Sequence, residues 1–481
     1  FILGCNFGDL GQDNTPKVSS VEIIELDESN TKNGKISLEG KVKENSKVYV
    51  VQVNQGEEDL DADYVGTLKN EVPFSNISNM ERSAGYNEDY DLRLNKTPSF
   101  VSEWNKKEPK EFISGSNEIN VLWSIDGDLE NAKPGDKNKR FIATWRDEDD
   151  PDNIVYYAAD YQLKYESEYA YVYYFPNIAC LIDDGEEGFF SDDDFEEIGN
   201  RFDIIYDAET NLMGEPVIKS HSYSNLIHTS SKISILVSDI YGDGTEENPG
   251  ETYGYFWGND YYINGIGSNY TENSNECQCI NIDSFLYKKY PDTVFSTLAH
   301  EFNHLLNFTN KVINHKTEKQ ESWYTEMLSM LSEDLLYENY IKTSKNTVIT
   351  NRIPWFNGFY NYGFMTWNDQ NSGMNYGNPF AYGSFLLRNY GGVELINEIA
   401  NNPYVNEESI TQALRVLKIP SSSGKGYATF EESVKDFALS VINYNVSIMI
   451  FFVFSYLIQF IRFNLFVIRI SDYNCLNFKI L

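Results

Sequence analysis

The sequence predicts an α+β fold in which antiparallel β modules are followed by a mixed sheet and then by a mainly helical C-terminal half. The front of the chain alternates apolar and polar residues, for example at 21–26, which is typical of half-buried strands. From Pro291 onward, apolar residues recur instead at the three- and four-residue spacing of a helix face. At 481 residues the chain is long enough for roughly two to four domains.

The β modules are expected at residues 20–105 and 106–175. Both regions consist of short alternating runs, such as 47–53 and 169–175, separated by turns rich in Asn, Gly and Asp. Three interpretations of these modules stay open: a packing scaffold for the next domain, a substrate- or surface-binding module, and an inhibitory pro-region.

A larger domain is expected at residues 176–445. Ser191 is a typical N-cap before an acidic first turn, and Phe195, Ile198 and Phe202 follow it at helical spacing. Strands are then expected at 233–240, 253–257 and 280–283, and late helices at 379–392, 393–400, 409–417 and 429–441.

The helix that starts near Pro291 carries two histidines and a glutamate in a chemically informative spacing. His300 and His304 lie one helical turn apart on the same face, where two imidazoles can bind one zinc ion. Glu301 stands next to the first histidine, in a position to take a proton from an activated water. The chain has only five histidines, so this arrangement rarely arises by chance. The alternative is an amphipathic helix with two ordinary histidines.

A catalytic zinc needs a third protein ligand and an open position for water. Glu326 follows His304 after 21 residues on a second predicted helix, 321–334, which allows the two helices to pack side by side. Glu321 and Glu333 are its rivals. Glu333 lies two turns further along the same face and better suits a partner that holds a ligand histidine in place.

These two motifs together resemble a known family. The run His300-Glu-Phe-Asn-His304-Leu-Leu-Asn-Phe, followed by Trp323-Tyr-Thr-Glu326 and by Glu333, is similar to the gluzincin metallopeptidases, and most of all to the hyicolysin-type secreted neutral metallopeptidases. The likeness covers residues 175–440. It implies a zincin domain with zinc ligands His300, His304 and Glu326, and with Glu301 as the general base.

The resemblance also concerns the groups around the ligands. Gluzincins commonly use a Tyr or His of the helical half to stabilise the oxyanion, which implies this role for Tyr382; a core tyrosine is the alternative. Met330 stands where thermolysin-like relatives have an Asp, and Met327 where a small residue is common. Both departures leave the zinc ligands themselves in place.

The composition of the chain limits the kinds of molecule and ion that it is expected to bind. The net charge of −35 argues against nucleic acid, because phosphate binding needs clustered Lys and Arg. Acidic loops at 183–187 and 239–247 offer oxygen ligands for Ca²⁺ without the EF-hand spacing, and solvated turns are the alternative.

The five cysteines form no disulfide framework, so Cys277 and Cys279 are expected to be structural or free. The remaining histidines, His221, His228 and His315, are expected at the surface.

The two ends of the sequence differ from the rest. Residues 1–5 resemble the end of a bacterial lipoprotein signal, with Cys5 as the lipidated residue and 1–19 as remnant and tether. This predicts a membrane-associated, extracytoplasmic protein at the bacterial cell surface or in the periplasm, or a secreted one. The apolar tail, 446–481, is either a membrane span or an out-of-frame artefact.

The sequence therefore predicts a secreted or surface-tethered zinc endopeptidase that cleaves proteins or peptides. The strand at 279–283 is expected to pair with an extended substrate, while zinc and Glu301 activate water and Glu301 passes the proton to the leaving amine. An exopeptidase is the nearer alternative, without an evident motif for a terminal amine or carboxylate. A non-catalytic surface adhesin with a structural zinc is the more distant one.

Overall fold

The computed structural model describes residues 97–105, 139–146, 154–176, 190–216, 232–263 and 273–444, apart from short gaps within 245–251, 338–351 and 361–371 and at 423. It also describes residues 134 and 226 and short strands between 20 and 53 and between 453 and 471. The chain forms two compact units. The larger unit contains Arg82–Gly358 and Trp367–Glu432, and the other contains Phe1–Glu81, Phe359–Thr366 and Ser433–Leu481.

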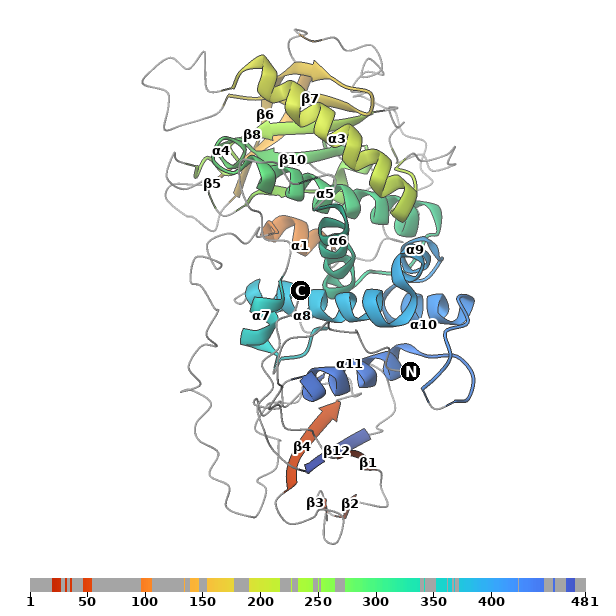
Figure 1. Cartoon of the computed structure of the whole chain (residues 1–481). Coiled ribbons are helices and arrows are strands. Elements are labelled where there is room, and N and C mark those ends of the chain that lie inside the picture. Colours follow the sequence, from red (N-terminus) through yellow and green to blue (C-terminus); the bar gives the residue numbers. More distant parts are fainter. Residues whose placement is uncertain are drawn as a thin grey trace, which may run out of the picture. The chain divides into compact units, whose positions relative to one another are not determined.

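A mixed sheet of six strands is the centre of the larger unit (Figure 1). Its order is β5-β6-β7-β8-β10-β9, in which β7, β8 and β10 run parallel and the other strands run antiparallel to their neighbours. The residues of β7, β8 and β10 are all buried, because helices and loops cover both faces there. The strands are β5 Lys139–Arg146, β6 Ile154–Glu166, β7 Ala170–Tyr174, β8 Ile233–Ser238, β9 Gly254–Tyr255 and β10 Cys279–Asp283.

This sheet joins two regions that the sequence pattern assigns to different domains. Strands β5 to β7 come from the region 106–175, yet β7 pairs with β8, with Ala170 opposite Ile233. The sheet thus begins upstream of the expected boundary at 176. Local alternation identifies strands but carries no information on which strands pair across 60 or so residues.

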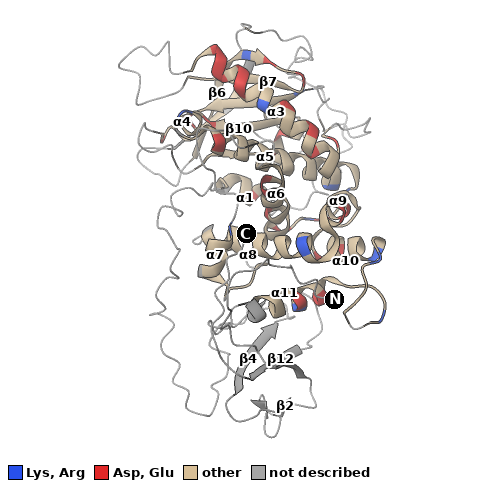
Figure 2. Cartoon of the chain, in the orientation of Figure 1, with Lys and Arg blue, Asp and Glu red and all other residues tan. Residues whose placement is uncertain are grey.

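Helix α3, Asp192–Met213, packs on β6 and β7 and against helix α5, Pro291–Asn307. The predicted N-cap is confirmed: the Ser191 side chain accepts a hydrogen bond from the backbone N–H of Asp194, whose carboxylate in turn accepts one from the backbone N–H of Ser191. Acidic residues fill its first turn, where the helix dipole favours negative charge (Figure 2). Phe202 and Tyr206 bury their rings against Phe302 of α5.

The C-terminal half is mainly helical, as predicted, and α5, α6 and α8 pack on one another in succession. The helix predicted from Pro379 in fact begins at Ser372, with Pro379 inside it. Tertiary packing outweighs the local cost of proline here, because a Cβ on Gly383 would lie 2.6 Å from Met327 of α6, so the two helices are in close contact. The helices are α4 Ser284–Lys289, α5 Pro291–Asn307 with a π-helical extension Phe308–Asn314, α6 Ser322–Leu336, α7 Ile353–Phe359, α8 Ser372–Leu386 with a π-helical extension Leu387–Gly391, α9 Gly392–Asn401, α10 Asn406–Val416 and α11 Phe430–Tyr444.

A buried lysine connects the extension of α5 to the turn between α9 and α10. The ammonium group of Lys311 donates to the backbone carbonyls of Ile399 at 2.6 Å, Asn402 at 2.7 Å and Tyr404 at 2.8 Å. Lys311 is fully buried. The three carbonyls satisfy its donors and take the place of water.

The first expected β module is only partly described. Residues 99–105, at its predicted end, form a short helix, α1 Ser99–Asn105, that belongs to the larger unit. In the other unit, β12 Asn464–Ser471 lies antiparallel between β1 Ser20–Leu26 and β4 Ser46–Val53. The remaining strands are β2 Thr31–Lys32, β3 Lys35–Ile36 and β11 Val453–Phe454.

In its described residues the apolar tail therefore contributes strands. Among the described helices, none has the length and hydropathy needed to cross a bilayer. Cys5, the acidic loop at 183–187, His221 and His228 lie outside the described residues.

Candidate active site

Helices α5 and α6 bring His300, His304 and Glu326 together. The Nε2 atom of His300 lies 3.0 Å from Oε2 of Glu326, and Nε2 of His304 lies 3.4 Å from Oε1 of the same carboxylate. The two Nε2 atoms are 3.2 Å apart. Among the described residues this is the group whose candidate ligand atoms converge, all within 4.8 Å of one another.

The hydrogen bond at Nδ1 of His300 determines whether Nε2 can act as a metal ligand. Nδ1 of His300 lies 2.8 Å from Oε1 of Glu333, and an ionised carboxylate can only accept, so Nδ1 carries the hydrogen. In the neutral ring, Nε2 then presents its lone pair to the cluster, which is the tautomer that a metal requires. Burial disfavours the charged ring, but hydrogen bonds to Glu326 and Glu333 outweigh it and raise the pKa of His300 to about 10. A metal ion at Nε2 replaces that proton.

Glu333 is itself held by two further groups. Its Oε1 accepts a hydrogen bond from Nη2 of Arg352 at 2.6 Å, and its Oε2 accepts one from the Ser296 hydroxyl. Burial opposes ionisation, but the Arg352 charge and these hydrogen bonds lower the pKa of Glu333, so it stays ionised beside His300. The sequence suggested the position of Glu333 through its helical spacing. No sequence signal indicated Arg352, which lies beyond α6 at the start of α7.

Glu301 lies on α5 next to His300, and its carboxylate reaches the end of β9, which borders the pocket. Its Oε2 accepts a hydrogen bond of 2.8 Å from the backbone N–H of Phe256, the residue after β9. Burial raises the pKa of Glu301, while the neighbouring histidines oppose the shift. A raised pKa brings a carboxylate closer to the range in which it exchanges protons near neutral pH.

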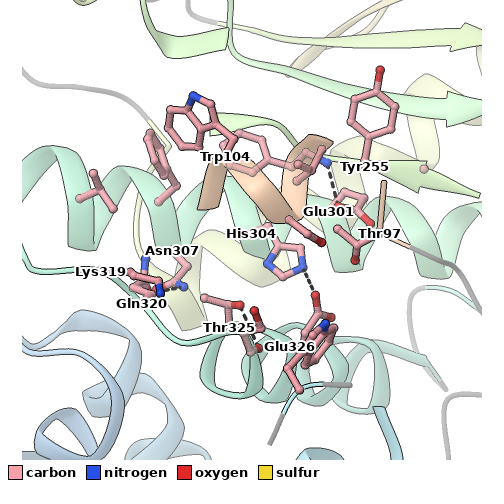
Figure 3. Close-up of a pocket in the computed structure, with 18 residues that line it drawn as sticks. Thr97, Trp104, Tyr255, Glu301, His304, Asn307, Lys319, Gln320, Thr325 and Glu326 are labelled. Atoms are coloured by element: carbon pink, nitrogen blue, oxygen red, sulfur yellow. Dashed lines mark hydrogen bonds and ion pairs between the residues drawn. The ribbon is translucent and has the colours of Figure 1, made fainter. Parts of the chain in front are cut away.

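A pocket opens beside these side chains (Figure 3). Glu301, His304 and Glu326 line it together with residues of β9, α1 and the first turn of α6. The predicted substrate pairing with 279–283 is wrong, because β10 is bonded on one side to β8 and on the other to β9. The strand at the sheet edge that borders the pocket is β9, which pairs with β10 at Tyr255 and Gly254.

Tyr382 lies in the helical half as expected but not in this pocket. Its side chain is fully buried in α8, and its ring meets Phe430 edge-on at 5.9 Å between centroids. Residues six positions apart on a helix lie on different faces. Tyr376 of the same helix shares a hydrogen bond of 3.1 Å with Thr97, which lines the pocket. Burial and the carboxylates of Glu326 and Glu301 raise the pKa of Tyr376. The oxyanion role of Tyr382 stays a prediction.

Further sequence predictions concern five residues that do not line the pocket. Met327 and Met330 are fully buried, and Glu333 supplies the carboxylate that Met330 does not. Cys277 and Cys279 are buried free thiols, as expected. His315 is exposed, also as expected.

In the acidic loop after β8, the first aspartate is buried and belongs to a closed turn. Asp239 is buried, and its Oδ1 accepts a hydrogen bond from the backbone N–H of Gly244 at 3.1 Å, which closes the turn. Burial and the charge of Asp243 raise the pKa of Asp239 to about 7.

Comparison with known proteins identifies a metallopeptidase as a relative of this chain. A neutral metalloprotease, ShpI of Staphylococcus hyicus, is 24% identical over 254 residues, covering 49% of this chain and 52% of that protein. This chain thus spans about half the length of that metallopeptidase. The family model that matches residues 193–447, more than half of the chain, is that of peptidase M30. The chain therefore belongs to the peptidase M30 family, and the resemblance to the hyicolysin-type enzymes is confirmed.

Proposed function

We propose that this protein is a zinc-dependent endopeptidase, secreted or tethered to the cell surface. The observation that carries the proposal is the convergence of two imidazole nitrogens and one carboxylate on a single point, with the other nitrogen of His300 fixed by Glu333. Three protein ligands with an open side are typical of catalytic zinc sites.

The donor set suits zinc in its chemistry. His300, His304 and Glu326 would hold the ion, and they line or adjoin a pocket from which substrate can approach. When bound, zinc polarises a carbonyl group and makes water more acidic. Two nitrogen ligands and one carboxylate are a common set for this metal in hydrolases.

Glu301 is the proton carrier in this proposal. The attacking water gives a proton to the Glu301 carboxylate as its oxygen adds to the scissile carbonyl, and Glu301 then gives that proton to the leaving amine. Its hydrogen bond from the N–H of Phe256 keeps the carboxylate turned toward the pocket.

The edge of the sheet favours an endopeptidase. Gly254, Tyr255 and Phe256 line the pocket, and β9 lies at the end of the described sheet order. An extended peptide that occupies the pocket would run beside this strand. Recognition of this kind uses the middle of a chain and needs neither of its termini.

The location rests on the lipoprotein-like residues 1–5. Mass spectrometry of the N-terminus of the protein from its native host tests it. A diacylated Cys5 supports surface tethering, and an unmodified Cys5 contradicts it.

The function is tested with Glu301→Gln, which keeps the shape of the side chain but cannot take a proton. The full chain and the variant are compared for zinc content and casein hydrolysis. Glu321→Gln is the control, because Glu321 is the exposed N-cap residue of α6 and lies outside the cluster of His300, His304 and Glu326. We expect about one zinc in all three proteins and a loss of activity on the order of 1,000-fold in Glu301→Gln alone. A parent protein that binds no zinc would contradict the assigned ligands, and a fully active Glu301→Gln would contradict the assigned base.

A further inference from the structure

Helix α1 lies far upstream of the family-matched segment 193–447, yet it forms part of the active-site pocket. Thr97, Val101, Ser102 and Trp104 line the same pocket as Glu301 and His304 (Figure 3). We propose that α1 is a specificity-determining wall of the substrate cleft, and that Trp104 sets the size of the apolar substrate side chain that is accepted beside the scissile bond. This inference rests on the proposed peptidase function.

The Trp104 end of α1 is fixed to the catalytic unit by close aromatic packing. The Trp104 ring lies 6.0 Å from the rings of both Tyr262 and Phe308, between centroids. Gly258 makes room for it, because a Cβ there would lie 2.9 Å from Trp104 and 2.7 Å from Phe308. Phe308 directly follows the helix that carries His300 and His304, so the wall and the candidate ligands share one rigid support.

The other end of α1 is fixed as well. The ring of Phe100 meets those of Tyr255 and Trp257 edge-on, at 5.3 and 4.9 Å between centroids. The hydroxyls of Thr97 and Tyr376 share a hydrogen bond of 3.1 Å. The segment is thereby attached to β9 on one side and to α8 on the other.

With these contacts α1 forms one side of the pocket and does not block it. The pocket is the space between α1 and the catalytic side chains, so α1 borders that space without filling it. The face of α1 toward the pocket is largely apolar: Val101 and Trp104 are both buried there. Phe256, Phe308 and Val312 extend the same apolar lining. The occupant that this chemistry recognises is an aliphatic or aromatic side chain of the substrate.

Replacing Trp104 by alanine enlarges the cleft, and Trp104→Phe enlarges it less. Hydrophobic pockets distinguish side chains that differ by a methylene group by about tenfold or more in kcat/KM. The measured quantity is the ratio of kcat/KM for a peptide with leucine next to the scissile bond to that for a peptide with tryptophan or phenylalanine there. We therefore expect this ratio to fall about tenfold in Trp104→Ala, and by a smaller factor in Trp104→Phe. Glu103→Ala, on the exposed side of the same helix, is the matched control and leaves the preference unchanged.

The experiment compares cleavage of a peptide library that varies the residues flanking the scissile bond by the full chain and these three variants. Zinc content and thermal stability are measured alongside, and Trp104→Phe keeps the comparison valid where Trp104→Ala does not fold. A zinc-loaded, folded Trp104 variant with the parental preference overturns the inference and leaves the proposed function intact. A uniform rise in cleavage of all peptides also overturns it, because α1 would then be a blocking segment. A zinc-loaded parent that cleaves no peptide overturns the proposed function and the inference together.

Discussion

Replacing Glu333 by glutamine is expected to weaken zinc binding without removing a ligand. The Glu333 carboxylate accepts a hydrogen bond from His300 at 2.8 Å and one from Arg352 at 2.6 Å, both at the same oxygen. Glutamine has nearly the same size but no charge, so both bonds lose their ionic component. His300 then keeps only a neutral acceptor, which fixes its tautomer and ring orientation less firmly.

The expected loss of zinc affinity is about 100-fold, or about 2.8 kcal/mol. Partners that orient a ligand histidine typically contribute 10- to 100-fold in affinity, and the upper end applies here for an electrostatic reason. In the Glu333→Gln variant the buried guanidinium of Arg352 no longer faces the charge of Glu333, and its own charge then opposes a divalent cation nearby.

A double variant separates the two contributions. Adding Arg352→Met to Glu333→Gln removes the opposing charge, and we expect this to restore the zinc affinity by about 2- to 10-fold. The orientation of His300 is not restored, so the double variant stays weaker than the parent.

Zinc affinity is measured by competition with a chromogenic chelator at constant pH, with the thermal stability of each metal-free protein as a check of folding. Asp334→Asn is the control, because Asp334 is the adjacent residue of α6 and pairs with Arg388 at the surface. Parental zinc affinity in a folded Glu333→Gln variant would refute the role given to Glu333. A double variant weaker than Glu333→Gln would refute the electrostatic part of the argument.

Three further predictions concern single residues. Lys311→Met is expected to lower the free energy of unfolding by about 3 kcal/mol in urea titrations, because three carbonyls lose their donor, and a loss under about 1 kcal/mol would contradict this. Burial raises the pKa of Asp260 to about 7, so ionisation is unfavourable in the folded state. The unfolding free energy of the parent should therefore fall relative to that of Asp260→Asn as the pH rises from about 4 to about 7, by about 1.4 kcal/mol per unit at most, and a constant difference would contradict it. Tyr382→Phe is expected to change kcat less than about threefold, since its ring is buried against Phe430; a loss of about 100-fold would instead support the oxyanion role.

The parts of the site that the sequence predicts well are those that depend on one helix or on two successive helices. His300 and His304 share a face through helical periodicity alone, and Glu326 follows from the return of the next helix. Arg352 and the N–H of Phe256 reach the site through tertiary packing, for which spacing in the sequence contains no signal.

The same distinction holds for the fold. Most helices from Pro291 onward were predictable from periodicity. The exceptions are α7, for which no helix was predicted, and the start of α8, where contact with α6 overrides the local preference of Pro379. Helix α1 is too short for a periodic pattern, and the order of the strands depends on pairings between distant segments.

The parallel pairing of β7 with β8 has a consequence for how this protein can be shortened and produced. The family-matched segment starts at 193, within α3, and so leaves out β7, although all six residues of β8 are buried. A shortened protein with that start would expose the backbone of β8 along a whole apolar edge, which is a template for self-association. The upstream strand β7 covers this edge of β8, so a protein that starts at 193 is expected to self-associate, and the upstream strands should be retained together with the family-matched segment.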